Sequence, residues 1–259
     1  MITMPSPIFA YIGEFIGTML LILLGDGVVA NTVLAKTKGN ALGAGWIVIT
    51  SGWAVGVIVG VQASIFASGG VINPAVAIGL ASLGLLSPLN AVGYIIAEIF
   101  GALVGAIIVY IAYLDHFKET NDPVLKLAVF STVPQIRNIA KNLVTELIGT
   151  FVLMLGVLSI VIPVQATATS IIQYRLPPYL VSLLVGFLVW GIGLSLGGPT
   201  GYAINPARDL GPRIAHAILP IPGKGKSDWG YGLVVPIFEP IIGALLASLV
   251  WSLYIMPAY

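Results

Sequence analysis

The sequence predicts an all-α integral membrane protein with six transmembrane helices and two shorter helices that enter the bilayer without crossing it. Of its 259 residues, 58% are hydrophobic and only 8% are charged, whereas a soluble globular chain carries about 25% charged residues. Six apolar runs are long enough for a membrane span, which takes roughly 20 residues. Two further apolar stretches are too short to span, and each begins at an Asn-Pro-Ala triplet.

The six long runs are continuous rather than alternating in polarity, which favours helices over the strands of a membrane β-barrel. They cover about residues 8–33, 41–66, 89–113, 139–161, 179–196 and 231–255. The short stretches cover residues 73–86 and 205–219, and apolar stretches of about 10–14 residues are more often re-entrant or buried than spanning. The first run lacks the basic start of a cleavable signal peptide, so we expect it to remain in the mature protein.

Charge and cysteine usage exclude several classes of function. The formal net charge is +1, which gives no reason to expect a nucleic-acid partner. The chain has no cysteine, which excludes disulfides and thiolate metal sites. His116 and His216 are far apart and belong to no metal-ligand or nucleophile motif. We therefore expect no metal, no cofactor and no enzymatic activity.

The two halves of the chain repeat one pattern. Glu14 stands 59 positions before Asn73, and Glu146 stands 59 positions before Asn205. Each half holds three spans, an odd number, so the second half must enter the membrane from the opposite side. The result is an inverted repeat, which places its working site near the bilayer midplane. The expected division of this single membrane domain, residues 1–259, is repeat 1 at about 8–113, a polar loop at 114–138 and repeat 2 at about 139–255.

Each Asn-Pro-Ala triplet carries the signals of a helix start. Asn is a favoured N-cap, and Pro at the first helical position gives up no helical hydrogen bond. The N-terminus of a helix carries roughly +0.5 charge, so two such ends at the midplane repel cations and protons, while the Asn amides offer donors to a neutral solute. A simple turn is the alternative for one triplet, and the equal repeat phase disfavours it for two. The triplets are Asn73, Pro74 and Ala75, and Asn205, Pro206 and Ala207.

With these motifs the chain resembles the major intrinsic protein family, the aquaporins and glycerol facilitators, over its whole length. The resemblance rests on the two triplets, on Arg208 directly after the second, and on the repeated Glu14 and Glu146. It implies an aquaporin-like fold, a pore in each subunit of a homotetramer and cytoplasmic termini.

The resemblance also implies a selectivity filter of the glycerol type, formed by Trp53, Gly193, Tyr202 and Arg208. Water-selective members commonly place His where Gly193 stands, and glycine would leave a gap there. Trp53 and Tyr202 would supply an apolar corner for a carbon backbone, while the planar guanidinium of Arg208 suits paired oxygens. The alternative for Trp53 is lipid or core packing, a frequent role of aromatic residues in membrane helices.

Several further acidic residues fall within or beside apolar runs. Asp209 directly after Arg208 is typical of the glycerol branch, and we expect a structural role for it, through Arg213 or nearby backbone N–H groups. Arg208 could instead form a structural ion pair with Asp209 or with Asp26, which we place at the end of the first span.

For Glu14 and Glu146 the choice is between a proton relay or ion site and a brace that accepts N–H groups from the neighbouring triplet loop. Their symmetry favours the brace. The sequence departs from the family pattern at Val71, usually His, at Glu98, usually Gln, and at Glu239, usually Gly. These departures could alter the permeation rate, a gate or the pH response.

The resemblance implies a passive pore for glycerol and similar small uncharged solutes that also passes water and excludes protons and ions. Dihydroxyacetone, urea, hydrogen peroxide and neutral lactic acid overlap with glycerol in size, so the sequence does not single out one solute. A water-selective or generalist pore of the same fold is the second hypothesis. An ion-coupled secondary transporter is the third, because inverted repeats and intramembrane carboxylates also fit it.

Loop charge and the resemblance disagree on orientation. Only Arg175 falls on the face of the termini, so the positive-inside rule would place the termini outside the cell, whereas the resemblance places them in the cytoplasm. Compact loops and short termini suit a bacterial plasma membrane. The basic residues expected on the opposite face are Lys36, Lys38, Lys118, Lys126, Arg137, Lys141, Arg213, Lys224 and Lys226.

Overall fold

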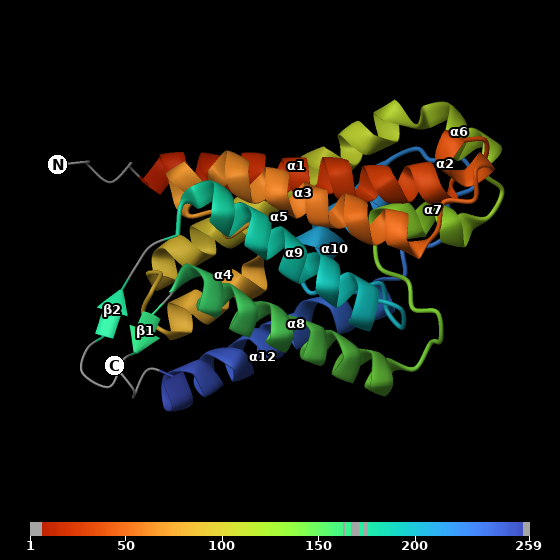
Figure 1. Cartoon of the computed structure of the whole chain (residues 1–259). Helices are drawn as coiled ribbons and strands as arrows, with labels where there is room; N and C mark the ends of the chain where they lie inside the picture. The colour runs from red at the N-terminus through yellow and green to blue at the C-terminus, as the bar shows by residue number, and fades with distance from the viewer. Residues whose placement is uncertain (1–6, 163, 167–170, 174–175, 256–259) are drawn as a thin grey trace.

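The computed structural model describes residues 7–162, 164–166, 171–173 and 176–255 of the chain (Figure 1). This part of the chain is helical except for a short antiparallel ribbon that the sequence did not predict. The ribbon pairs β1 (Val164–Ala166) with β2 (Ile171–Gln173). It lies in the connection between two spans, so the predicted all-α membrane class is confirmed.

Six helical segments are long and apolar enough to cross a membrane, as predicted. The last of them, Trp229–Tyr254, is interrupted near its start and ends in a π-helical turn; its parts are α11 (Trp229–Gly232), α12 (Val235–Val250) and η1 (Trp251–Ile255). The other five are α1 (Pro7–Val33), α3 (Trp46–Ser68), α5 (Pro88–Ala112), α8 (Ile139–Val161) and α9 (Pro178–Leu196).

The two half-helices begin where the capping signals predict. In α4 (Pro74–Ser82) and α10 (Pro206–Ile218), Pro is the first helical residue and the preceding Asn is the N-cap. Helix α4 ends four residues before the predicted boundary at 86. Its chain turns away at Gly84, whose φ of +71° is in the left-handed region that favours glycine.

The connection predicted as a polar loop contains two helices, α6 (Leu114–Glu119) and α7 (Pro123–Phe130). Asp122 caps α7 by accepting a hydrogen bond from the N–H of Val124, with Pro123 at the first position. Helix α7 packs against both α1 and α10, and Val129 and Phe130 are fully buried. A third short helix, α2 (Lys38–Ala41), ends where the second span was predicted to begin, and that span begins five residues later, at Trp46.

The helices form two groups that share their half-helices. Helices α1, α3 and α5 pack together, α8 packs against α12, and α9 bridges the groups by contacting α3 and α8 (Figure 1). Helix α10 lies against α5 of the first group, and α4 lies against α12 of the second. Each half of the chain thus holds the half-helix of the other. The repeat boundaries at 8–113, 114–138 and 139–255 remain a prediction.

Small residues allow the closest of these approaches. A Cβ added to Gly17 of α1 would lie 2.8 Å from the carbonyl oxygen of Gly60 in α3, and one added to Gly60 would lie 2.6 Å from the carbonyl oxygen of Gly17. Any larger residue at either position would force the helices apart, consistent with the use of small residues at helix contacts in membranes.

One basic residue assigned to a loop face lies inside the protein. Arg213 is fully buried in α10 and pairs with Asp209, so it does not count as a loop charge. Helix α1 begins and η1 ends on the same side of the bundle, opposite α2, α6 and α7 (Figure 1). Arg175 lies outside the described residues, so its expected place on the side of the termini is not observed.

Candidate functional site

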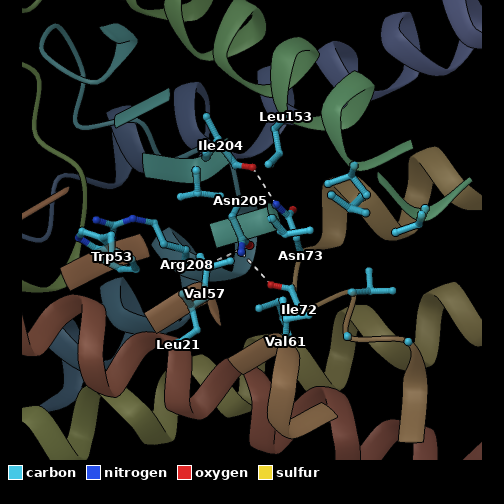
Figure 2. A pocket seen from close by; sticks show the side chains of 18 of the residues that line it. Leu21, Trp53, Val57, Val61, Ile72, Asn73, Leu153, Ile204, Asn205 and Arg208 are labelled. Atoms are coloured by element: carbon cyan, nitrogen blue, oxygen red, sulfur yellow. Dashed lines mark hydrogen bonds between the residues drawn. The ribbon is translucent and has the colours of Figure 1, made fainter. Parts of the chain in front are cut away.

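The N-terminal ends of α4 and α10 meet at the centre of the molecule and are joined by two reciprocal hydrogen bonds (Figure 2). The Nδ2 atom of Asn73 donates to the carbonyl oxygen of Ile204 at 2.9 Å, and that of Asn205 donates to the carbonyl oxygen of Ile72 at 2.8 Å. Their Oδ1 atoms cap the helices from the other side. Because each amide nitrogen carries two hydrogens, each Asn keeps one donor beyond its structural bond.

The loops before the triplets are held in an unusual backbone conformation. Ile72 has φ +43° and Ile204 has φ +42°, a region that is a genuine outlier for β-branched residues. Glu14 accepts hydrogen bonds from the N–H groups of Val71 and Ile72. Glu146 does the same for the loop before α10, where one bond comes from the N–H of Ile204 at 2.8 Å. The two glutamates therefore fix the loops that aim these carbonyl oxygens at the opposite Asn.

A third carboxyl group adds to the hold on the first loop. Glu98 of α5 is fully buried, and its Oε1 atom accepts a hydrogen bond from the N–H of Asn73 at 3.0 Å. The departure from the family pattern at this position thus lies against the first triplet. Glu239, another departure, is half-buried on α12, and Val71 lies beside Ile72 in the wall of a cavity that runs past the triplets.

Two cavities meet at an aromatic and arginine constriction. One cavity runs past Asn73 and Asn205, the other opens beside Trp46, and both are lined by Trp53, Tyr202 and Arg208. The first cavity has mostly apolar walls, to which α3, α4, α8 and α9 contribute the side chains of Val57, Val61, Val76, Leu80, Leu153, Val157, Val161, Val181, Val185 and Val189. Its side-chain donors include the two Asn amides and the guanidinium. The cavity thus combines mostly apolar walls with a few hydrogen-bond donors.

Contacts from several elements position the constriction side chains. The guanidinium carbon of Arg208 lies 4.1 Å from the ring centroid of Trp53, within the range of a cation–π contact. Its Nη1 atom donates to the carbonyl oxygen of Phe130 at 3.4 Å. Trp46 packs edge-to-face on Tyr202 with ring centroids 5.8 Å apart. Trp46 and Phe130 are contacts that no motif in the sequence indicated.

Gly193 differs from its expected role. We expected it to leave a gap, but the ring of Tyr202 fills that place. A Cβ added to Gly193 would lie 2.8 Å from Cζ of Tyr202 and 3.0 Å from Cγ2 of Thr50. Gly193 is not among the residues that line either cavity. Glycine is required here because Tyr202 packs directly against the helix.

The comparisons with known proteins agree with this architecture. The family model for the major intrinsic proteins matches residues 1–251. The chain belongs to this family. Among solved structures, the aquaglyceroporin from Plasmodium falciparum superposes with a TM-score of 0.82 at 28% identity and covers 97% of this chain and 98% of that one.

Two curated relatives are closer in sequence. A Thermotoga maritima protein named "Probable glycerol uptake facilitator protein" is 58% identical over 244 residues, which are 94% of this chain and 97% of that protein. The glycerol uptake facilitator protein of Streptococcus pneumoniae serotype 4 is 48% identical over 242 residues, or 93% of this chain and 97% of that one. These relatives and the helical spans indicate a multi-pass membrane protein of bacterial type.

Directly after the constriction arginine, this family member carries a buried polar cluster. Asp209 accepts hydrogen bonds from Nε of Arg213 at 2.7 Å and from the N–H of Thr132 at 2.8 Å. Arg213 in turn donates from Nη1 to the carbonyl oxygen of Ser227 at 2.7 Å. Asp209 and Arg213 are fully buried. The cluster ties α10 to the chain after α7 and to the chain before α11.

The predicted position of Asp26 at the end of the first span is wrong. Helix α1 continues to Val33, and the side chain of Asp26 is fully buried. Its Oδ1 atom lies 3.9 Å from Nη1 of Arg208. Of the two ion pairs considered for Arg208, the structure thus shows the one with Asp26, since Asp209 is bound to Arg213. Among the described residues, no cluster of three His, Cys, Asp or Glu side chains could hold a metal ion.

Proposed function

We propose that this protein is a passive channel for glycerol and similarly small uncharged solutes, which also passes water and excludes protons and ions. Its family consists of channels rather than enzymes, and the relatives at 58% and 48% identity carry the name glycerol uptake facilitator. The observation that carries the proposal is the sequence of groups along the two cavities: two Asn amides at facing helix ends, and then a constriction lined by the rings of Trp53 and Tyr202 and by Arg208.

These groups suit an uncharged polyol better than an ion. Hydroxyl oxygens can accept hydrogen bonds from Asn73, Asn205 and Arg208, while the carbon backbone lies against the apolar walls. A cation meets two positive helix ends in an environment of low dielectric constant, where electrostatic repulsion is strong. A solute without net charge avoids this barrier. The arrangement is already formed in the structure, and no energy source is needed for downhill flux.

We assign three roles within this proposal. The selectivity filter comprises Trp53, Gly193, Tyr202 and Arg208, with Gly193 acting through its contact with Tyr202. The pore centre comprises Asn73, Pro74, Ala75, Asn205, Pro206 and Ala207. The structural supports are Glu14, Glu146 and Asp209, as their buried hydrogen bonds suggest.

We also propose that the protein is a homotetramer in a bacterial plasma membrane with cytoplasmic termini. Large apolar side chains exposed along the spans are available to lipid or to neighbouring subunits; they include Phe66, Phe100, Phe187 and Leu253. Such exposure suits a membrane protein, because soluble monomers rarely expose large apolar patches.

Stopped-flow light scattering on proteoliposomes tests the function. Under a glycerol gradient we expect rapid re-swelling that does not change when ion gradients are collapsed. Gly193→Ala should lower the glycerol permeability by about tenfold, because overpacking costs of about 1–3 kcal/mol would fall on Tyr202 at the constriction. Gly191→Ala, on the same helix with nothing within 4 Å of its added Cβ, is the matched control and should behave as wild type.

The contrary outcomes are distinct. Rapid shrinkage in impermeant sucrose without glycerol entry would indicate a water-selective pore and contradict the glycerol assignment. Glycerol flux that requires a proton or sodium gradient would instead indicate an ion-coupled transporter.

A further inference from the structure

Asp26 has no role in the proposed channel, yet it is placed as a functional residue would be. It lies about two turns before the end of α1, its side chain is fully buried, and neither carboxylate oxygen has a hydrogen-bond partner within the described part of the chain. An ionisable group inside a membrane protein is costly and is retained for a partner or a function. The ion pair that Asp26 forms is with Arg208, at 3.9 Å.

Asp209 cannot replace Asp26 as the ion-pair partner of Arg208. Although adjacent in sequence, its two carboxylate oxygens accept hydrogen bonds from Nε and Nη2 of Arg213 and from the N–H and hydroxyl groups of Thr132. Asp209 and Arg213 therefore neutralise each other away from the cavities. The carboxyl group that faces Arg208 comes from α1, at the opposite end of the sequence.

The packing of α1 brings Asp26 to the constriction. A Cβ added to the neighbouring Gly25 would lie 2.2 Å from Cζ3 of Trp53, so the Trp53 ring lies directly against the α1 backbone. The guanidinium of Arg208 lies over the same ring. Three elements thus surround this guanidinium: α3 with the Trp53 ring, α7 with the Phe130 carbonyl oxygen, and α1 with the Asp26 carboxylate.

We propose that Asp26 is a positioning residue that cancels the charge of Arg208, so that the constriction rejects anions as well as cations. The physical need arises from the two half-helices. Their positive ends already disfavour cations, and an uncompensated guanidinium beside them would make the path attractive to anions. A buried carboxylate about 4 Å from the guanidinium removes most of that attraction, because both charges act through the same medium of low dielectric constant.

The test measures charge selectivity in proteoliposomes and rests on the proposed neutral-solute channel. Nitrate entry is monitored by light scattering under a potassium nitrate gradient, with valinomycin carrying the potassium. Asp26→Asn, nearly equal in shape, should raise the nitrate permeability by about tenfold or more, since it removes one full charge beside Arg208. Asp26→Glu should restore the exclusion of nitrate. Asp115→Asn, at an exposed carboxylate of α6, is the control for charge removal elsewhere.

Glycerol flux in the same vesicles separates this inference from the proposed function. In Asp26→Asn we expect it to fall by about threefold at most, because the guanidinium retains its contacts with Trp53 and Phe130. A wild-type protein without glycerol flux would refute the proposed function. An Asp26→Asn variant that conducts glycerol yet excludes nitrate as well as wild type does would overturn the role of Asp26.

A second variant keeps the inference testable if Asp26→Asn does not fold. Asp26→Ser removes the same charge with a smaller side chain, and we expect the nitrate permeability to rise by about tenfold or more. Adding Arg208→Leu to Asp26→Ser removes the charge that attracts the anion and should return the nitrate permeability toward the wild-type value. Equal nitrate permeability in Asp26→Ser and wild type would contradict the proposal.

Discussion

The two half-helices begin in the same way and differ in the residues just beyond their caps. After its Asn-Pro-Ala triplet, α4 continues with Val76 and Ala77, both buried and apolar. At the equivalent positions α10 carries Arg208 and Asp209, also buried. The capping geometry is nearly symmetric, whereas the charged chemistry lies in one half only.

This difference separates two tasks of the site. Facing helix ends need two matching copies, because each cap holds the carbonyl oxygen of the other loop. Selection among neutral solutes needs only one charged constriction, and a second Arg in α4 would add a second buried charge that must be compensated. The second half therefore carries a polar cluster around Asp209 and Arg213, while the first half faces an apolar wall.

Breaking the polar cluster should have the largest effect on stability. Asp209→Ala leaves Arg213 buried without its ion-pair partner, which costs about 3–5 kcal/mol. We expect a large fall in the thermal unfolding midpoint in detergent. Asp115→Ala, at an exposed pair with Lys118, should change the midpoint little, because solvent screens exposed ion pairs.

A double variant distinguishes loss of charge balance from loss of packing. In Asp209→Ala with Arg213→Met, no buried charge is left unpaired, so much of the stability should return. If the double variant were less stable than the single one, the cluster would matter for its hydrogen bonds and shape rather than for its charge.

The C-terminal end of α10 makes the stability of the fold depend on pH, and α4 has no such effect. His216, outside the six spans, is buried, and burial together with the nearby Lys224 and Arg213 lowers its pKa to about 4. The folded state therefore keeps His216 neutral, while the unfolded chain binds a proton below the ordinary pKa of about 6.5. Stability from this group is complete above that pH and is lost as the pH falls toward 4.

We expect this group to lower the free energy of unfolding by about 2 kcal/mol between pH 7.5 and pH 5. Unfolding measured at both pH values in wild type and His216→Gln checks it, with a smaller loss expected in the variant. Helix α4 contains no titratable residue and offers no matching effect. Equal pH dependence in the two proteins would show that His216 is not responsible.

Local signals predicted the parts of the fold that are determined locally. Asn before Pro marked both half-helices, and long apolar runs marked the six spans to within a few residues, apart from α3. Helix α7 was missed because its stretch is short and lies in an otherwise polar connection, and its burial depends on contacts with α1 and α10. The four filter residues were named by resemblance, and three of them line both cavities.

The remaining errors concern contacts between distant segments. Nothing around Asp26 indicates that α1 faces Arg208, because that depends on how Gly25 packs against Trp53. Gly193 was interpreted as open space for the same reason, since the position of the Tyr202 ring is not a local property. Such pairs require the packed structure.

The loop braces give the finest comparison between the halves. Glu146 accepts from the N–H groups of Ala203 and Ile204 and from the Thr200 hydroxyl. Replacing it with Gln puts an amide group opposite a donor, and an unsatisfied buried N–H costs about 1–3 kcal/mol. We expect Glu146→Gln to lower the unfolding midpoint in detergent and to reduce glycerol flux.

Glu14→Gln should also lower the stability and the glycerol flux, with a loss of stability about 1 kcal/mol smaller than in Glu146→Gln. Glu98 holds the N–H of Asn73 with its Oε1 atom, beside the loop that Glu14 braces, and its Oε2 atom has no hydrogen-bond partner within the described part of the chain, so the new amide can find an acceptor there. Glu119→Gln, at an exposed pair with Lys36, is the surface control. In a Glu98→Leu background, Glu14→Gln should lower the stability as much as Glu146→Gln does. If Glu14→Gln were still the milder substitution there, Glu98 would not be the reason for its smaller effect.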